Sequence, residues 1–205
     1  MKTFSFCFAL LIAGVSLCSN AHAGQYNETL SIGDAAPSWA DLPGTDGKMH
    51  SLAEFKDKPV VVVVFTCNSC PVAGDYEDRI VALAKKHVGG KVGLVAINVN
   101  KIEADSLPKM KEKAEAKGFT FPYLYDDTQK IGKAFGAMFT PEFFVLNQER
   151  KIVYMGAMDD NTDAKVVTKN YLEPAIEAAL GGTKPPTAET LAVGCRVRYA
   201  RERKP

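Results

Sequence analysis

An unbroken apolar run at 60–65, Val-Val-Val-Val-Val-Phe, is the strongest hydrophobic pattern outside the first residues of the chain. β-Branched and aromatic residues favour strands, and the lack of polar alternation predicts a strand that is covered on both faces. Such a strand occupies a central position in an α/β sheet. Two further apolar stretches, at 92–99 and 121–125, predict neighbouring strands, and Pro122 limits the second to a sheet edge or a first strand position.

Helical periodicity separates these strands. An amphipathic helix that ends near Gly89-Gly90 is predicted by apolar residues at helical spacing, namely Val72, Tyr76, Ile80 and Leu83. Further helices are predicted over 105–117, 128–135 and 168–180, the last with a kink at Pro174. Two late strands, at 143–146 and 151–155, flank a hairpin connection.

The resulting order of elements is β–α–β–α–β–α–β–β–α. It predicts parallel strands with right-handed crossovers at the beginning and an antiparallel hairpin at the end. We therefore expect an α/β fold with a central mixed β-sheet flanked by helices. Glycines and prolines between 33 and 47 predict an N-terminal hairpin extension of turns and short strands, and Lys184-Pro185-Pro186 opens a C-terminal tail.

Residues 1–23 have the pattern of a secretory signal peptide. Lys2 supplies a positive charge, 4–17 is almost entirely apolar, and Ala21-His22-Ala23 places small residues where signal peptidase cleaves. The apolar run is shorter than the roughly 20 residues that a spanning helix needs, which favours a cleaved segment over a membrane anchor. We expect an exported protein, periplasmic or secreted, with one domain over 24–182 and a tail over 183–205.

Cleavage changes the charge and the cysteine content. The full chain has 25 Lys and Arg and 24 Asp and Glu, so the loss of Lys2 leaves a formally neutral protein. A neutral chain argues against a nucleic-acid partner held by bulk charge. The cysteines that remain are Cys67, Cys70 and Cys195, too few for a fold that is stabilised mainly by disulfide bonds. One closely spaced pair of cysteines and one further cysteine favour a redox function.

The segment Cys67-Asn68-Ser69-Cys70-Pro71 lies where the central strand gives way to a helix. Backbone N–H groups at a helix N-terminus carry partial positive charge and stabilise a thiolate, so a lowered pKa is expected for Cys67. Cys67, at the mouth of the helix, is predicted to be the nucleophile and Cys70 the resolving thiol. A zinc half-site and a static disulfide are the rival interpretations. Zinc would need two more ligands. Cys195 and the histidines could supply them, but none of these residues has a second ligand residue at the short spacing typical of zinc sites.

A second signature is Thr140-Pro141, directly before the strand at 143–146. Only about one X–Pro bond in twenty is cis in folded proteins, so this pair alone favours an ordinary proline that opens a strand. Together with the cysteine pair it favours a tight, cis bond. Such a bend presents the Thr140 backbone to an extended peptide or to the active sulfur.

Four segments, at 33–37, 65–71, 139–144 and 193–197, resemble motifs of the thioredoxin superfamily and, in detail, of its peroxiredoxin-like, redoxin-type branch. The resemblance covers roughly residues 31 to 200. It implies a thioredoxin-like fold, a dithiol centre at Cys67 and Cys70 in a CxxC motif, and a cis peptide bond before Pro141. The chain departs from thioredoxin in having no acid within 60–64 and in carrying Pro71 after the second cysteine.

Two alternative functions fit the same family. In a peroxiredoxin-like thiol peroxidase, Cys70 would occupy the place of the peroxidatic cysteine with Cys67 resolving, although the threonine that positions the peroxide is missing. A copper chaperone of redoxin fold would use both cysteines and a distant histidine. Neither His50 nor His87 lies on the later loop where that ligand is expected.

Thiol–disulfide exchange is the function that we expect from the sequence. Its substrates would be protein or small-thiol disulfides, with a thiol reductant or oxidant and no cofactor beyond the redox-active disulfide; no metal, nucleic acid or membrane span after cleavage is expected. The predicted catalytic residues are Cys67, Cys70, Thr140 and Pro141, and the predicted substrate-binding residues are Thr66, Asn68, Ser69, Pro71 and Phe139. Cys195 stays open between a third redox thiol, a dimer link and an inert buried residue.

Overall fold

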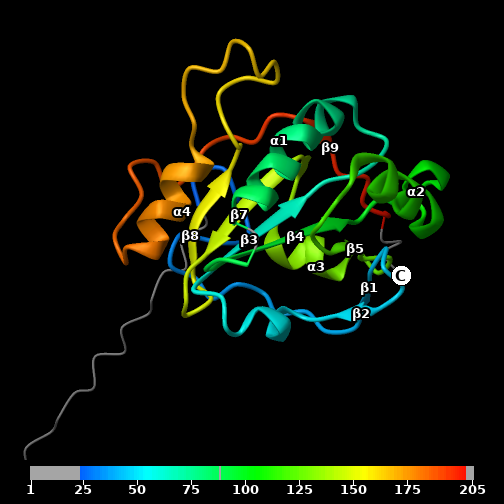
Figure 1. The fold of residues 1–205 in the computed structure, drawn as a ribbon, viewed down its shortest axis with the longest axis horizontal. Helices are drawn as coiled ribbons and strands as arrows, with labels where there is room; N and C mark the ends of the chain where they lie inside the picture. Colours follow the sequence, from blue (N-terminus) through cyan, green and yellow to red (C-terminus); the bar gives the residue numbers. More distant parts are fainter. Residues whose placement is uncertain (1–23, 88, 202–205) are drawn as a thin grey trace, which may run out of the picture.

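A computed structural model describes residues 24–87 and 89–201 of the chain. Its centre is a five-stranded sheet in the order β5-β4-β3-β7-β8 (Figure 1). The strands span Val60–Phe65 (β3), Val92–Asn98 (β4), Tyr123–Tyr125 (β5), Glu142–Leu146 (β7) and Ile152–Gly156 (β8). Strands β3, β4 and β5 are parallel, whereas β7 is antiparallel to both β3 and β8. The predicted mixed sheet is confirmed, and β5 is an edge strand, one of the two positions that Pro122 allowed.

Both faces of the sheet are covered. Val60, Val62 and Val64 pack into a core with α1 (Pro71–His87) and α4 (Leu172–Leu180). The alternate residues of β3, Val61, Val63 and Phe65, face a second core. This core contains Trp39 and also Phe135, the last residue of α3 (Lys130–Phe135). Because neither face of β3 meets water, all of its positions are apolar, which explains the missing alternation.

The remaining elements are short and frame the sheet. Helix α2 spans Leu107–Lys117, and 3₁₀ turns span Leu52–Phe55 (η1) and Glu103–Asp105 (η2). The expected N-terminal hairpin is formed by β1 (Leu42–Pro43) and β2 (Met49–His50). A second two-stranded ladder joins β6 (Phe139–Thr140) to β9 (Cys195–Arg196), so the C-terminal tail lies against the domain (Figure 1).

Three predicted helices begin later than the sequence indicated, and the one expected over 128–135 starts at Lys130. The helix expected over 168–180 starts at Leu172, because the Asn170 side chain accepts the Glu173 N–H and the Thr168 side chain bonds to Asp160. Pro174 therefore lies in the first turn, where its missing N–H costs no helical hydrogen bond, and the predicted kink is wrong. The helix expected from Asp105 starts at Leu107, since η2 precedes it.

The predicted signal peptide, residues 1–23, lies outside the described residues. Within 24–87 and 89–201, no helix is long and apolar enough to cross a membrane.

Candidate functional site

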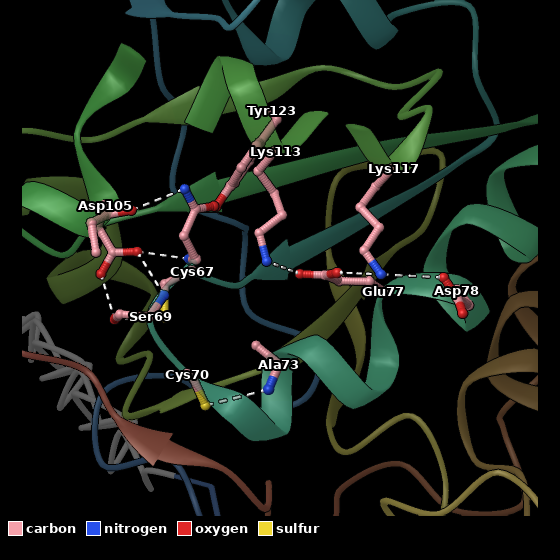
Figure 2. A network of polar contacts seen from close by, with 12 residues as sticks. Cys67, Ser69, Cys70, Ala73, Glu77, Asp78, Asp105, Lys113, Lys117 and Tyr123 are labelled. Carbon is pink, nitrogen blue, oxygen red and sulfur yellow. Dashed lines mark hydrogen bonds and ion pairs between the residues drawn. The ribbon is translucent and has the colours of Figure 1, made fainter. Parts of the chain in front are cut away.

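The cysteine pair lies at the carboxyl edge of β3, where the chain turns into α1 (Figure 2). Helix α1 begins at Pro71, so Cys70 directly precedes its first residue and Cys67 lies further upstream. The Ala73 N–H donates a hydrogen bond to Cys70 Sγ at 3.3 Å. This is the geometry of a helix N-cap, with sulfur in place of the usual oxygen. The positive end of the helix therefore acts on Cys70 more directly than on Cys67.

Thr140 connects both sulfur atoms. Its Oγ1 lies 3.4 Å from Cys67 Sγ, and the Cys70 thiol donates to its carbonyl oxygen at 3.1 Å. The Thr140–Pro141 peptide bond is cis, as predicted. The two predicted signatures, far apart in the sequence, thus form one site.

The surroundings of the two sulfur atoms shift their pKa values in opposite directions. Burial raises the pKa of Cys67, and the nearby carboxylate of Asp105 raises it further, against the hydrogen bond from Thr140. Burial also disfavours the Cys70 thiolate, but hydrogen bonds from the Cys195 thiol and the Ala73 N–H outweigh it and lower the pKa of Cys70. The expectation of a lowered pKa at Cys67 is therefore wrong, since the helix begins at Pro71 and its N-terminus stabilises the second sulfur.

Cys195 is the third sulfur of the site. It packs against Cys67 and Cys70, and the β6–β9 ladder places it directly opposite Thr140. Hydrogen bonding to the Cys70 sulfur raises the pKa of Cys195 to about 11.

Asp105, which was not among the predicted site residues, fixes the loop between the two cysteines. Its buried carboxylate accepts the N–H groups of Asn68 and Ser69 at 2.6 and 3.1 Å and the Ser69 hydroxyl at 2.6 Å (Figure 2). The Asn100 side-chain amide donates to it as well, at 3.2 Å. The sequence carries a signal for this arrangement. Asn98 is the last residue of β4, Asn100 and Asp105 come soon after it, and neighbouring parallel strands end at the same sheet edge.

Several residues predicted to bind substrate take part in hydrogen bonds within the protein, at the loop and at the end of β3. The Asn68 side chain donates to the Ala104 carbonyl at 3.0 Å and accepts the Tyr123 hydroxyl at 3.1 Å. The Thr66 N–H extends the ladder to the Ile97 carbonyl at 3.0 Å. Two others lie nearer the surface: Pro71 is exposed, and the half-buried Phe139 ring lies 5.5 Å from the Arg196 guanidinium.

Beside Cys67 lies a cavity of about 10 Å³, room for about one water molecule. Its walls include Glu77 of α1 and Lys113 of α2, whose charged groups are 2.6 Å apart, and Lys117 lies 3.1 Å from the same carboxylate (Figure 2). The sequence showed no acid in the strand before the cysteines. The fold brings Asp105 and Glu77 to the site from other elements.

The histidines lie apart from the sulfur atoms. His50 bonds to Asp46 and Glu54 at 3.0 and 2.8 Å in the region of the hairpin. His87 ends α1, with its ring nitrogen 3.8 Å from Glu173. Across the part of the chain that the structure describes, no three His, Cys, Asp or Glu side chains gather in a metal-binding arrangement. The geometry thus gives the copper-chaperone interpretation no support.

Comparison with known sequences identifies relatives over most of the chain. Residues 31–172 match the sequence model of the Redoxin family. A Mycobacterium tuberculosis protein named as a peroxiredoxin is 28% identical over 146 residues, which cover 69% of this chain and 85% of that protein. The thiol-disulfide oxidoreductase ResA of Geobacillus thermodenitrificans is 24% identical over 180 residues, covering 86% and 91%.

Solved structures agree with the fold. A hypothetical protein from Sinorhizobium meliloti superposes with a TM-score of 0.80 at 31% identity, covering 86% of this chain and 98% of that one. A thioredoxin family protein from Chlorobium tepidum gives a TM-score of 0.58 at 22% identity, covering 74% and 99%. The thioredoxin-like fold expected from the sequence is confirmed.

Proposed function

Because this chain belongs to the redoxin family, we propose that it is a thiol–disulfide oxidoreductase whose redox centre is the Cys67–Cys70 pair. The observation that carries the proposal is the sharing of Thr140 by both sulfur atoms at the N-terminus of α1. The dithiol becomes a disulfide, and its two electrons and two protons pass to an external disulfide, which becomes two thiols. The reaction needs no bound cofactor.

Cys70 is the thiolate of the pair in this proposal, and Cys67 is the resolving thiol. This reverses the roles expected from the sequence, because the Ala73 N–H and the Cys195 thiol stabilise negative charge on Cys70. A thiolate, rather than a thiol, is the nucleophile in disulfide exchange.

The reaction is proposed to take place outside the cytoplasm. The support is the signal-peptide pattern of residues 1–23, with cleavage after Ala23. Exported compartments permit disulfides in proteins, and the substrates there would be protein or small-thiol disulfides.

Turnover of cysteine variants tests the redox centre. We expect Cys70→Ser to slow the reduction of a fluorescent glutathione disulfide by about 100-fold or more, since the stabilised thiolate is lost. Val166→Ser, on the exposed surface of another loop, is the matched control and should react at the wild-type rate. Full turnover by Cys70→Ser, or a wild-type protein that forms no Cys67–Cys70 disulfide, contradicts the proposal.

A thiol peroxidase is the second candidate, favoured by the lowered pKa of the buried Cys70 sulfur. The thiolate would attack a hydroperoxide, release water or an alcohol and become a sulfenic acid, which Cys67 would convert to a disulfide with loss of water. In Cys67→Ser/Cys195→Ser, hydrogen peroxide with dimedone should label Cys70. Peroxide consumption that is independent of Cys70 would exclude this candidate.

A further inference from the structure

The redox pair is closed off from solvent, and the protein's own tail packs against it. Cys67 and Cys70 are only 4% and 2% exposed, whereas Cys195 is half-buried. Thiol–disulfide exchange requires the attacking sulfur atom to reach the sulfur atom that it attacks. A partner sulfur can therefore reach Cys195 more readily than either member of the pair.

The tail around Cys195 is held in place by hydrogen bonds on both sides. Before it, the Thr190 N–H donates to the Met155 carbonyl at 3.1 Å. After it, the Val197 N–H donates to the Met138 carbonyl at 2.8 Å, and the Tyr199 hydroxyl donates to the Ala137 carbonyl at 2.7 Å. The position of Cys195 is thus fixed by the fold.

Strand β9 also occupies the edge of β6. Cys195 pairs with Thr140, the residue that contacts both sulfur atoms of the pair, and its thiol lies within hydrogen-bonding reach of Cys70 Sγ. An extended peptide could not pair with β6 while β9 is present. The fold presents Cys195 to the pair in the place where the sequence analysis expected a substrate strand.

We propose that Cys195 is a third redox-active cysteine, which exchanges disulfides with Cys70 and connects the buried pair to partner thiols at the surface. This inference rests on the proposed function of the pair. It decides between the three roles that the sequence left open for Cys195.

The exchange balances in three steps. In the oxidised protein, the Cys195 thiolate attacks Cys70 Sγ, so the Cys67–Cys70 bond breaks and Cys67 leaves with the electron pair and takes up a proton. A partner thiolate then attacks Cys195 Sγ and forms a mixed disulfide, and the electron pair of the broken Cys70–Cys195 bond goes to Cys70. A second partner thiol releases Cys195 and forms the partner disulfide. An external disulfide is reduced by the same steps in reverse.

The surroundings of the sulfur atoms suit this order. The Ala73 N–H stabilises the Cys70 thiolate as it leaves, and thiols of low pKa leave faster. In the reduced protein, hydrogen bonding to Cys70 raises the pKa of Cys195. That cause disappears when Cys70 is bound in a disulfide, so Cys195 ionises more readily in the oxidised protein, where it attacks Cys70.

Reduction of the oxidised protein by glutathione tests the role of Cys195. Cys195→Ser should still form the Cys67–Cys70 disulfide but be reduced about tenfold or more slowly than wild type, since the surface route is lost. Val193→Ser, 55% exposed on the same tail, is the matched control and should keep the wild-type rate. Reduction of Cys195→Ser at the wild-type rate would overturn the inference and leave the proposed function standing. If wild type forms no Cys67–Cys70 disulfide, the proposed function itself fails.

A second variant tests the sulfur–sulfur contact without relying on rates. Cys67→Ser, oxidised with diamide, should yield a Cys70–Cys195 disulfide within one chain, identified by mass spectrometry of non-reduced peptides. Cys70 and Cys195 that both remain open to alkylation after this treatment would refute the proposed exchange.

Discussion

At the scale of single residues, the two sulfur atoms of the CxxC motif differ because their hydrogen bonds differ. Cys70 accepts a helical N–H and the Cys195 thiol, whereas Cys67 lies in a buried position near the Asp105 carboxylate. Both sulfur atoms are buried, so burial alone does not rank them. The ranking follows from donors that come from α1 and β9.

Asp105 is the residue on which the conformation of the loop depends most. Its two carboxylate oxygens together accept five hydrogen bonds, from Asn68, Ser69, Asn98 and Asn100. In Asp105→Asn, one oxygen becomes an amide donor that faces other donors. We expect a loss of about 1–3 kcal/mol in the free energy of unfolding, measured by denaturant titration.

The same substitution should also lower the pKa of Cys67, because the negative charge that disfavours its thiolate is removed. Thiolate absorbance against pH in Cys70→Ser/Cys195→Ser, with and without Asp105→Asn, isolates this effect. Glu103→Gln, an exposed acid in the same 3₁₀ turn, is the control. An unchanged pKa of Cys67 would mean that Asp105 acts on the loop by position alone.

At the scale of elements, the contact between β6 and β9 closes the site. Gly194, directly before β9, lies so close to Thr140 that a Cβ would overlap the Thr140 carbonyl. The backbone of the tail can approach this loop only with glycine at that position.

Gly194→Ala should therefore displace β9 from β6 and expose the cysteine pair. Alkylation of Cys70 at a pH where all of it is thiolate should become about tenfold faster, as expected for easier local opening. Gly74→Ala in α1, where a Cβ meets no atom within 4 Å, is the matched control and should leave the alkylation rate unchanged. Unchanged alkylation in Gly194→Ala would show that the tail does not limit access.

At the scale of the whole molecule, one buried acid links stability to pH. Glu142 follows Pro141 in β7 and is 7% exposed, and its carboxylate accepts the N–H groups of Met138 and Phe139 at 2.8 and 3.0 Å. Burial nevertheless raises the pKa of Glu142 from 4.5 to about 7. Between these two values the folded protein binds a proton that the unfolded chain does not bind. The stability contributed by this group is full at low pH and is lost as pH rises from about 4.5 to about 7.

Glu142→Gln should remove this dependence, since an amide does not ionise. We expect the variant to be more stable than wild type by about 1–3 kcal/mol above neutral pH and similar to it in acid. Urea unfolding at several pH values measures the difference. Glu149→Gln, an exposed acid in the β7–β8 connection, should follow the wild-type curve. If the free energy of unfolding of Glu142→Gln depends on pH in the same way as that of wild type, Glu142 is not the source of this pH dependence.

The sequence by itself determined the sheet and the location of the redox pair. An apolar run buried on both faces belongs in the interior of an α/β sheet, and a helical pattern directly after it places Cys67 and Cys70 at the carboxyl end of that strand. Local backbone preferences and hydrophobic burial decide such features, so neighbouring residues are enough to predict them. The cis bond before Pro141 also followed, though only in combination with the cysteine motif.

Only the tertiary structure decided which sulfur is the better thiolate, what holds the loop and where Cys195 lies. The spacing of the CxxC motif does not show which cysteine has the lower pKa. That depends on helix α1, which begins at Pro71, directly after Cys70. Asp105 and Cys195 reach the site from η2 and β9, through hydrogen bonds between segments that are distant in the sequence. Burial and electrostatic effects depend on such long-range contacts, and no local pattern of residues encodes them.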